Sequence, residues 1–323
     1  MKSRILITGA AGFIGSNLAD YLLDKGILVL GIDNFDPFYD RGIKENNIKT
    51  ALGNTGFQFR EGDIRDRDFI GKCFTDFQPD VVVHLAAKAG VRPSLADPES
   101  YFDVNVMGTL NILEMMNKKN ISKLIFASSS SVYGNNEKVP FSENDNVDYP
   151  VSPYAASKKA AELLCHTFHH LYKPDIFCMR FFTVYGPRQR PDLAIHKFVK
   201  ALLTDEMIYL FGDGTTSRDY THIEDIIKGL SAAIENVKGF EVLNLGNSKP
   251  ISLIDLVRLL EKSSGRKSRL KYLPMQQGDV IRTFADITKA RTMLDYDPEV
   301  DIEKGIRNYV KWFSEFVLQS KSC

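Results

Sequence analysis

Short apolar runs alternate with longer segments of mixed pattern through the first half of the chain. The apolar runs have strand length and are rich in isoleucine, valine and leucine, at residues 4–8, 27–33, 81–85 and 123–127. Segments with helical spacing of apolar positions separate them, at residues 13–25, 67–76 and 98–118. Continuous apolar strands that alternate with helices are typical of a parallel sheet covered on both faces. The pattern therefore predicts an α/β fold built on a doubly wound parallel sheet.

The alternation extends to a helix at 154–172 and a strand at 176–180, and it loosens after residue 181. Loops rich in glycine, proline and arginine follow, with helices expected at residues 193–204, 223–236, 252–263 and 302–316. A strand pattern returns at 241–245. We predict a larger domain over residues 1–181, to which a segment at about 221–245 returns. A smaller α/β domain over residues 182–323 is expected to bind most of the substrate.

Composition and charge narrow the class of protein. With 44% hydrophobic and 25% charged residues among 323, the chain resembles ordinary globular proteins. Its formal net charge is zero, so we expect neither a nucleic-acid nor a membrane partner. We also expect no signal peptide and no membrane span. The cysteines lack metal-ligand or redox spacing, which favours reduced thiols in a cytoplasmic protein. They are Cys73, Cys165, Cys178 and Cys323.

Three glycines at three-residue spacing, Gly9, Gly12 and Gly15, separate the first strand from the first helix. The first permits a tight turn, the second lets the backbone approach a pyrophosphate, and the third lets the helix pack on the strand. The N–H groups at the start of the helix, around Phe13 and Ile14, are then available to phosphates. This context predicts a Rossmann domain that binds a dinucleotide; the alternative is a glycine-rich turn without a ligand.

Asp33 ends the second strand, 18 residues after Gly15. A carboxylate at this position accepts hydrogen bonds from a ribose and repels a 2′-phosphate, so NAD is favoured over NADP. Asp63 and Ile64, in the stretch "EGDIRD", are candidates for the adenine edge, unless they form a plain turn. Small residues in "HLAAKAG" (84–90) suit a backbone that passes close to the cofactor, with Lys88 facing ribose or phosphate. We assign His84 to the core. The further expected cofactor residues are Asn34, Leu85, Ala86, Ala87 and Asn105.

The stretch "YAASK" places Tyr154 and Lys158 four residues apart, on one face of the predicted helix. A phenol with its ordinary pKa of about 10 is a weak base at neutral pH. A nearby ammonium favours the phenolate and would lower that pKa. Lys158 is also placed to hold the nicotinamide ribose. The pair therefore suggests acid–base chemistry beside a nicotinamide cofactor.

Eight stretches together carry a family resemblance that covers almost the whole chain. They are "TGAAGFIG", "HLAA", "NVMGTLNILE", "SSSSVYG", "YAASK", "RFFTVYGPRQRPD", "GDGTTSRDYTHIEDI" and "QGDVIRTFADITKA". The chain resembles the extended short-chain dehydrogenases/reductases that act on nucleotide sugars. The resemblance implies that Ser129 assists a catalytic pair made of Tyr154 and Lys158.

The two positions after Ser129 distinguish reactions within this family. Related nucleotide-sugar 4,6-dehydratases carry Asp and Glu there, and related UDP-glucuronate decarboxylases carry Glu at the second position. Here both are serine, Ser130 and Ser131. Elimination or carbanion protonation needs a titratable group within reach, so these reactions are disfavoured. Epimerisation remains, in which Tyr154 moves the proton of the 4′-hydroxyl and NAD is regenerated in every cycle.

The segment "RFFTVYGPRQRPD" is similar to UDP-glucuronate 4-epimerases, whereas UDP-glucose epimerases carry a sequence like "RYFN" at its start. A carboxylate at C6 would be bound by a guanidinium and hydroxyl donors. We expect Arg190 and Thr183 to provide them, with Ser130. The alternative is that Arg188 and Arg190 bind diphosphate or face solvent, and that Asp192 pairs with one of them.

The resemblance places the UDP end of the substrate at Arg218, Asp279 and Arg282, for diphosphate, uridine ribose and phosphate. Gln276 stands where many relatives have arginine, which weakens this assignment. Thr283 stands where some UDP-hexose epimerases carry a bulky residue, and a small side chain there keeps a UDP-N-acetylhexosamine substrate open. UDP-glucose is a further alternative.

The long helices at 98–118 and 154–172 have apolar faces, and the resemblance implies that they form a homodimer interface. His166, His169 and His170 have one-turn spacing on the second helix, but we assign no metal to them. Two broader alternatives remain: a dehydratase, decarboxylase or reductase of the same family, or a nucleotide-binding protein without catalysis.

Overall fold

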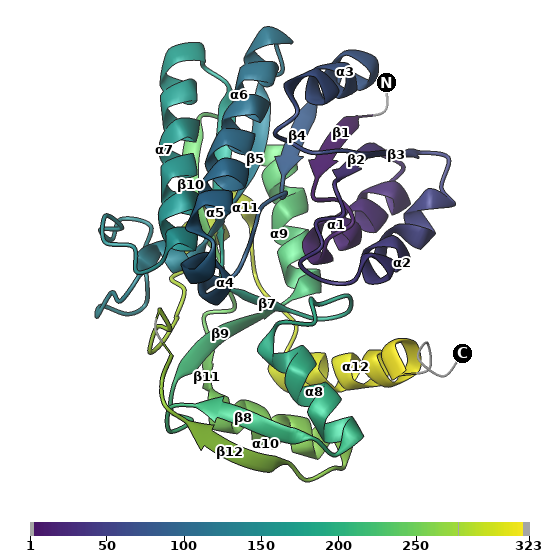
Figure 1. The fold of residues 1–323 in the computed structure, drawn as a ribbon. Coiled ribbons are helices and arrows are strands. Elements are labelled where there is room, and N and C mark those ends of the chain that lie inside the picture. The colour runs from purple at the N-terminus through teal and green to yellow at the C-terminus, as the bar shows by residue number, and fades with distance from the viewer. Residues whose placement is uncertain (1–2, 277, 319–323) are drawn as a thin grey trace.

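A computed structural model describes residues 3–276 and 278–318 of the chain (Figure 1). Seven parallel strands form the central sheet in the order β10-β6-β5-β4-β1-β2-β3. Their bounds are β1 Arg4–Thr8, β2 Leu28–Asp33, β3 Phe57–Glu61, β4 Val81–His84, β5 Lys123–Ser129, β6 Asp175–Phe181 and β10 Phe240–Leu245. The predicted doubly wound parallel sheet is confirmed. The strand order reverses between β1 and β4, and ligands of such sheets bind at the carboxyl ends of the strands beside the reversal.

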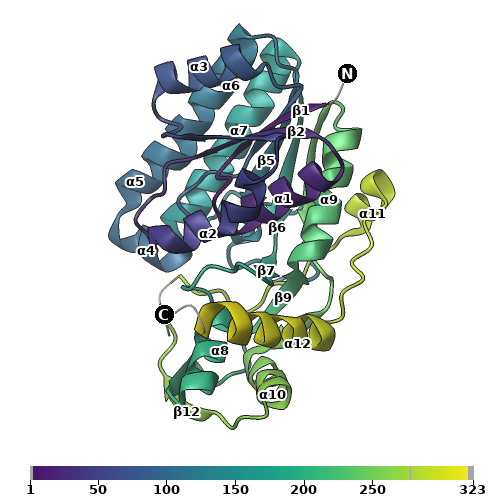
Figure 2. The same cartoon turned by 90° about the vertical axis from the view of Figure 1, so that its right-hand side faces the viewer.

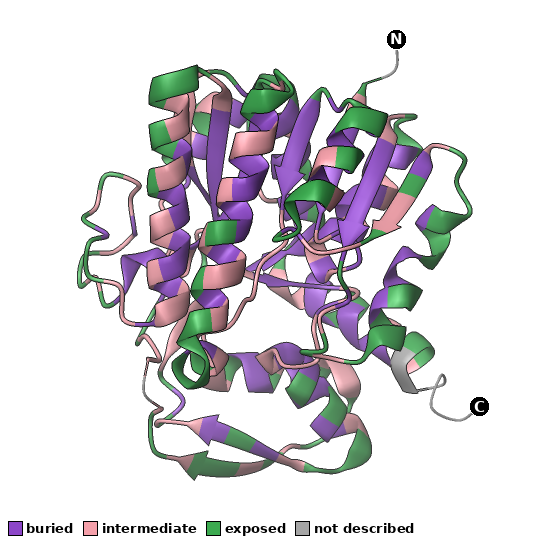
Figure 3. Cartoon of the chain, turned by 45° about the horizontal axis from the view of Figure 1, so that its top comes forward, coloured by how far each residue is buried: buried purple, intermediate pink, exposed green. Residues whose placement is uncertain are grey.

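Helices cover both faces of this sheet, so its inner strands are buried on both sides (Figure 3). One face carries α1 Phe13–Asp24, α2 Arg41–Leu52, α9 Ile223–Asn236 and α11 Thr288–Leu294. The other carries α3 Arg67–Phe77, α6 Gly108–Lys118 and α7 Pro153–Tyr172. The double cover explains why the strands read as continuous apolar runs and not as an alternation of apolar and polar residues.

Two local differences from the sequence-based prediction have physical causes. The helix predicted at 98–118 consists of α5 Pro98–Phe102, a π-helical turn η1 Asp103–Met107 and α6. Helix α2 escaped prediction because its buried positions include the polar residues Lys44 and Asn47, which break the apolar periodicity. A short 3₁₀ turn, η2 Ser130–Tyr133, follows β5 directly.

A smaller part of the chain lies below the carboxyl ends of the large sheet (Figures 1 and 2). It contains a three-stranded sheet of β7 Thr183–Tyr185, β9 Ser217–His222 and β11 Pro250–Ser252, and a pair, β8 Met207–Phe211 and β12 Arg269–Leu273. Helices α8 Ala194–Thr204, α10 Leu253–Ser264 and α12 Ile302–Trp312 pack on them. A separate apolar cluster holds these elements together. The domain limits given by the sequence stay a prediction, because the chain crosses between the two parts several times.

Helix α4 Val91–Ala96, which follows the loop after β4, borders the segment between β12 and α11: a Cβ at Gly278 would lie 2.9 Å from Val91. The segment between β12 and α11 returns along it and reaches the loop after η2, where Phe141 N–H donates to the carbonyl of Phe284 over 2.7 Å. The space between the two parts is thereby enclosed by chain segments that lie far apart in the sequence.

Candidate active site

A cleft with a volume of about 660 Å³ lies at the carboxyl ends of β1, β4 and β5. This volume falls within the range of about 300–1,000 Å³ typical of small-molecule sites. Residues from the glycine turn, the ends of β2 and β5, the start of α7 and the segment after β6 line it. The cleft is therefore the place where the fold brings the predicted cofactor and catalytic residues together.

The glycine turn brings three backbone segments into direct contact. Gly9 has a φ of +72°, and a Cβ there would lie 2.8 Å from the backbone nitrogen of Ala86. A Cβ at Gly15 would lie 2.2 Å from the carbonyl oxygen of Gly9. Gly12 caps α1, and no side chain binds the N–H groups at this helix end. Because Phe13 and Ile14 line the cleft, those N–H groups are available to an anionic ligand.

Asp33 ends β2 at the wall of the cleft and is 9% exposed. Its carboxylate accepts hydrogen bonds from the backbone of Ala11 (3.0 Å) and Phe35 (2.9 Å). Burial raises the pKa of Asp33, while these two bonds and the Lys44 charge act in the opposite direction. The two backbone bonds fix the orientation of the carboxylate, and each oxygen retains a further lone pair for a ligand hydroxyl.

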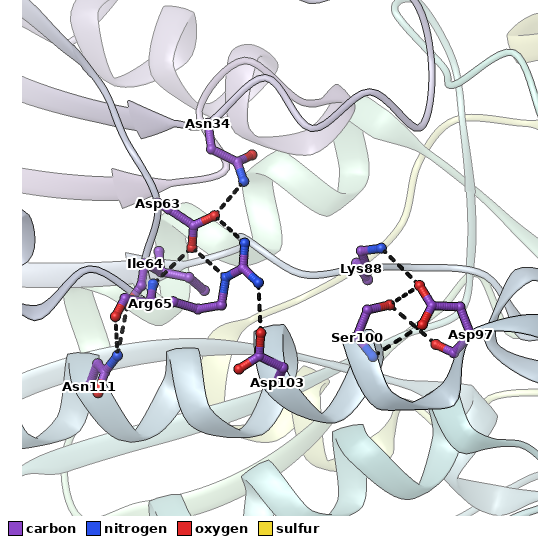
Figure 4. A network of polar contacts seen from close by, with 9 residues as sticks. All are labelled: Asn34, Asp63, Ile64, Arg65, Lys88, Asp97, Ser100, Asp103 and Asn111. Atoms are coloured by element: carbon purple, nitrogen blue, oxygen red, sulfur yellow. Dashed lines mark hydrogen bonds and ion pairs between the residues drawn. The ribbon is translucent and has the colours of Figure 1, made fainter.

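Asp63 and Asn34 lie side by side at one end of the cleft (Figure 4). The Asn34 amide donates to Asp63 over 2.8 Å, and Arg65 donates to both carboxylate oxygens over 2.9 and 2.8 Å. The Arg65 guanidinium lowers the pKa of Asp63 to about 2. Arg65 also donates to Asp103 of η1 over 2.6 Å. Asp63 is therefore ionised at neutral pH and held in place by its neighbours.

Ile64 is buried beneath the same end of the cleft. A Cβ at Gly108, at the start of α6, would lie 2.4 Å from its Cδ1. The Asn111 amide donates to the carbonyl groups of Ile64 and Arg65 over 3.2 and 3.1 Å (Figure 4). Helix α6 thus positions the loop that carries Asp63 and Ile64.

Lys88 lines the cleft, whereas Asn105 lies behind it. The Asn105 side chain accepts from the Lys88 N–H over 2.8 Å and donates to its carbonyl over 3.0 Å. It also donates to the Ser157 hydroxyl on α7 over 2.9 Å. The Lys88 ammonium lies 3.4 Å from Asp97 (Figure 4). Asn105 therefore holds the backbone of Lys88 in place, and its predicted direct contact with a cofactor stays a prediction.

The four consecutive serines have different surroundings. Ser128 is buried and donates to Glu162 of α7 over 2.6 Å. Ser129 accepts from the backbone of Ser131 over 3.1 Å and donates to its hydroxyl over 3.1 Å. Ser129, Ser130 and Ser131 face the cleft. The turn after β5 thus offers the cleft neutral hydroxyl groups and no carboxylate.

Tyr154 lies in the first turn of α7, whose N-terminus the Ser152 hydroxyl caps. Its ring packs edge-to-face on Tyr101 at a centroid distance of 6.1 Å. Burial raises the pKa of Tyr154, while a hydrogen bond with Ser129 and the charge of Arg190 act in the opposite direction. Ser129 and Arg190 are therefore the groups that favour the phenolate here.

Lys158 lies one turn after Tyr154 and is also buried. Its ammonium donates to the carbonyl of Ala127 over 2.8 Å and lies 5.1 Å from the centroid of the Phe126 ring. Burial lowers the pKa of Lys158 to about 8. The expectation that Lys158 lowers the pKa of Tyr154 stays a prediction. In this structure the ammonium is turned toward the end of β5.

Arg190 and Thr183 line the cleft on the side formed by the segment after β6. It binds Asp192 in a bidentate manner, over 2.9 Å from Nε and 2.7 Å from Nη2. Its guanidinium lies 5.4 Å from the centroid of the Phe38 ring. The Arg188 side chain instead pairs with Asp20 of α1 over 2.6 Å and does not line the cleft. Of the two arginines weighed from the sequence, Arg190 is the one at the cleft.

Several cleft residues were not predicted from the sequence. They are Asp36, Phe38, Tyr39, Lys44, Val91, Tyr101, Val104, Val184 and Leu193, among others. The pair Phe38 and Tyr39 follows Asp33 closely, so an aromatic pair after the strand-ending acid is a signal that could have been used. Lys44 gave no such signal because it belongs to the unpredicted helix α2, where its ammonium donates to the carbonyl of Asp36 over 2.6 Å.

The residues predicted for the UDP end do not line this cleft. Asp279 is paired with Arg92 of α4 over 2.7 Å, and the Arg92 guanidinium lies 4.5 Å from the centroid of the Phe211 ring. Arg218 donates to the carbonyl of Ser217 over 2.9 Å. Arg282 is exposed. Their roles in binding stay predictions.

The segment that carries Asp279 nevertheless lies next to the cleft. A Cβ at Gly278 would lie 2.9 Å from Val91, which lines the cleft. Thr283 is buried, and its hydroxyl accepts from the backbone of Asp219 over 3.1 Å. Thr283 is not among the residues that line the cleft, so its small size does not widen this space.

Residues 3–276 and 278–318 contain no cluster of three or more histidine, cysteine or acidic side chains arranged to hold a metal ion. In the same residues, no helix has both the length and the apolar character needed to cross a bilayer.

Comparison with known proteins gives consistent matches along the chain. The family described as GDP-mannose 4,6 dehydratase matches residues 6–309. A UDP-glucuronate 4-epimerase from Thermodesulfobacterium geofontis is 43% identical over 318 residues, which cover 98% of each protein. The crystal structure of UDP-glucuronic acid 4-epimerase from Bacillus cereus, in complex with UDP-glucuronic acid and NAD, has a TM-score of 0.92 and 40% identity. The match covers 97% of this chain and 99% of that one. UDP-glucose 4-epimerase from Thermotoga maritima, with UDP-glucose, has a TM-score of 0.90 and 32% identity, with the same coverage.

The lowered pKa of Lys158 predicts a specific pH dependence of stability. Its value of about 8 lies below the ordinary 10.5, so the unfolded chain holds this proton more tightly than the folded protein. Between these two pH values the wild type should gain stability relative to Lys158→Met, by up to about 3 kcal/mol. Urea denaturation of both proteins from pH 7.5 to 10.5 measures this difference. Lys271→Met, at an exposed lysine, is the control and should show no such trend. A pH-independent difference between wild type and Lys158→Met would contradict the assignment.

Proposed function

The chain belongs to the nucleotide-sugar epimerase family of extended short-chain dehydrogenases/reductases, and we propose that it is an NAD-dependent UDP-glucuronate 4-epimerase. One observation carries the proposal. Ser129, Tyr154 and Lys158 meet at the cleft, and the turn beside them contributes only the neutral hydroxyls of Ser130 and Ser131. Three relatives that match nearly the whole chain are named as epimerases.

The glycine turn and its surroundings fit NAD. The uncapped N-terminus of α1 suits the pyrophosphate. Gly9 and Gly15 carry no side chain at the two points where backbone segments of the turn come into contact. Asp33 has lone pairs for ribose hydroxyls and would repel a 2′-phosphate. NAD supplies a hydride acceptor that becomes the hydride donor, so that one sugar carbon is oxidised and then reduced. The Bacillus cereus relative is named as an NAD complex, which supports this choice.

Tyr154 is the acid–base residue of the proposed reaction. Its phenolate would accept the proton of the sugar 4′-hydroxyl as C4′ loses hydride, and the resulting phenol would return that proton when hydride comes back to the opposite face of the 4-keto sugar. Ser129 orients the 4′-oxygen, and with Arg190 it favours the phenolate. Lys158 provides a positive charge at the start of α7, since its pKa of about 8 keeps most of it protonated at neutral pH.

The absence of an acid at Ser130 and Ser131 argues against other reactions of the family. Elimination of water from the sugar needs an acid and a base beyond Tyr154, and these two positions provide neither. The family description names a dehydratase, but the description covers a broad family and does not decide the reaction of each member. Epimerisation needs only the exchange of hydride and proton at one carbon.

Arg190 is the proposed ligand of the sugar carboxylate, with Thr183 and Ser130 as hydroxyl partners. Asp192 occupies Nε and Nη2, and within the described residues Nη1 makes no hydrogen bond. That edge is the one we assign to the carboxylate. The need for it is chemical, because the 4-keto form of glucuronate is a β-keto acid that loses CO₂ when its carboxylate stands perpendicular to the carbonyl plane. A fixed carboxylate prevents this geometry.

UDP-glucose or UDP-N-acetylglucosamine is the second candidate substrate. The observation that favours it is the bidentate Arg190–Asp192 pair, which offsets the charge that would attract a carboxylate. The Thermotoga maritima neighbour is named as a UDP-glucose epimerase. The sugar that is turned over fastest therefore decides between the two candidates.

We also propose that the protein works in the cytoplasm as a homodimer. Cys73, Cys165 and Cys178 are free and buried, which suits a reducing compartment, while Cys323 lies outside the described residues. Helices α6 and α7 lie side by side at one edge of the molecule (Figure 1). Apolar side chains project into solvent from α7 and from the neighbouring α4, α5 and η1, namely Leu95, Phe102, Met107, Leu163 and Leu171. A second copy of this chain would cover this surface through the same helices.

The primary test is NMR of the purified protein with UDP-glucuronate and no added cofactor. We expect UDP-galacturonate to appear without added cofactor, since NAD remains bound between cycles. No CO₂ should be lost, because the carboxylate is held in place. Tyr154→Phe should stop turnover while the protein keeps its NAD, because the phenol takes no part in holding the pyrophosphate. Turnover of UDP-glucose alone would select the second candidate, and wild-type rates in Tyr154→Phe would refute the assigned base.

Arg190 variants test the carboxylate assignment. Arg190→Ala should lower kcat/KM for UDP-glucuronate about 100-fold, because charge-assisted bidentate bonds are among the strongest polar contacts. It should also release CO₂ and a UDP-4-keto-pentose during turnover. Arg190→Lys keeps the charge but loses the planar fork, and it should still leak CO₂. Equal losses with UDP-glucuronate and UDP-glucose, without CO₂, would assign Arg190 to phosphate binding or to the fold.

The dimer proposal predicts a molecular mass near twice that of the chain in light scattering. Leu163→Glu, at a side chain that is 56% exposed on α7, should shift the mass toward the monomer. Leu52→Glu, at a leucine that is 57% exposed on α2, is the matched control and should leave the mass unchanged. A monomeric wild type would refute the proposal.

A further inference from the structure

Three residues of α7 at four-residue spacing, Tyr154, Lys158 and Glu162, lie on one stripe of the helix. The first two belong to the candidate active site. Glu162 has no place in the proposed chemistry, yet its side chain is 3% exposed, and a carboxylate is seldom buried without partners. Its surroundings therefore need an explanation.

Glu162 binds two neighbouring strands at once. Its Oε1 accepts from the Ser128 hydroxyl at the end of β5 over 2.6 Å. Both of its oxygens accept from Arg180 of β6 over 2.9 Å. Ser128 and Arg180 are partners in the parallel register of β5 and β6, so the carboxylate spans the two strands at the same level.

The strands that Glu162 holds lead directly into the cleft. Ser128 precedes Ser129, and the Ala127 carbonyl accepts from Lys158 over 2.8 Å. The end of β5 is thus tied to α7 at two successive residues, once by Lys158 and once by Glu162. Arg180 lies three residues before Thr183, and its guanidinium lies 4.8 Å from the centroid of the Tyr133 ring in the turn after the serines.

We propose that Glu162 is a positioning residue of the active site, which fixes Ser129 relative to Tyr154 and maintains the charge of Lys158. The Ser128–Glu162 hydrogen bond keeps the Ser129 hydroxyl at a fixed position relative to the Tyr154 phenol. Its two ends lie on β5 and α7, the elements that carry Ser129 and Tyr154. Lys158 and Glu162 lie one helical turn apart, and their side chains bind successive residues of β5, Ala127 and Ser128. This inference rests on the proposed function, since it gives Glu162 a part in the chemistry of Ser129, Tyr154 and Lys158.

The electrostatic part follows from the groups around Lys158. Burial lowers its pKa, and Cys165 and Glu162 act in the opposite direction. His84 of β4 is neutral, because burial and the Lys158 charge lower the pKa of His84 to about 3. The titratable and charged groups around this position are Tyr154, Glu162 and Cys165 of α7, His84 of β4, and Cys178 and Arg180 of β6. Glu162 is the one carboxylate among them.

Ser128→Ala tests the tie without disturbing the buried ion pair. We expect kcat for the UDP-sugar to fall about tenfold while KM and thermal stability change little, because the Ser128 hydroxyl is directed at Glu162 and only one hydrogen bond is lost. Ser231→Ala is the matched control: this buried serine lies 3.5 Å from Glu235 on α9, on the other face of the sheet, and should keep wild-type kcat. Wild-type kcat in Ser128→Ala would overturn the tie.

Glu162→Gln tests the charge. Titration of ¹³Cε-labelled lysines by NMR, with the Lys158 signal assigned through Lys158→Met, should show a lower pKa for Lys158 than in the wild type. The alkaline limb of kcat should move to lower pH with it, which a merely structural role would not produce. An unchanged Lys158 titration would overturn the electrostatic part. The titration needs no substrate, so a wild type that turns over no UDP-sugar would refute the proposed function while this result still stood.

Glu162→Gln leaves Arg180 without its charged partner, which destabilises the protein whatever the role of Glu162 in the active site. Glu162→Leu/Arg180→Met removes both charges and keeps an apolar volume, a change that buried ion pairs often tolerate. This double variant should fold with kcat reduced at least tenfold. A folded double variant with wild-type kcat would show that the pair serves the fold alone and would overturn the proposal.

Discussion

The close approach of backbone to backbone at the glycine turn is the constraint on which the rest of the site depends. At Gly9 and Gly15 the neighbouring main chain occupies the space of a side chain, so β1, the loop after β4 and the start of α1 form one contact. This contact brings the N–H groups of α1 to the point where the strand order reverses. The cleft opens at that point because the segments beyond β1 and β4 diverge to opposite sides of the sheet. Without the glycines, neither the helix end nor the loop could lie where a dinucleotide would meet both.

Burial shapes the chemistry of the opposite wall. It raises the pKa of Tyr154 and lowers that of Lys158, so each group is moved toward its neutral form. The polar neighbours act in the other direction: Ser129 and Arg190 for the phenol, and Glu162 and Cys165 for the ammonium. The reactivity of the site thus comes from a balance between desolvation and a small number of specific contacts. The serine turn contributes to this balance by remaining neutral.

The sequence predicted most of the sheet because its strands are buried on both faces and read as uninterrupted apolar runs. It predicted the glycine turn and the Tyr154–Lys158 spacing because these signals are local. It did not predict α2, whose buried face contains Lys44 and Asn47. Contacts between distant segments were also beyond it: Asn105 holding the backbone of Lys88, and Arg92 pairing with Asp279. Nor could it show where Lys158 points, since helical spacing gives the face of a side chain but not its hydrogen-bond partner.

The π-helical turn η1 changes the directions in which side chains point along the continuous helix formed by α5, η1 and α6. A π turn holds one more residue than an α turn, and one residue corresponds to a rotation of about 100° around the helix axis. The side chains after the turn are therefore rotated about the helix axis, relative to the directions that the helix before the turn would give them. Asn105 lies within η1 and is buried, while Phe102 before it and Met107 after it are exposed. One continuous helix can in this way place a polar side chain in the interior and apolar side chains on both sides of it at the surface. In an uninterrupted α-helix the spacing of about 100° per residue would fix the angle between these side chains.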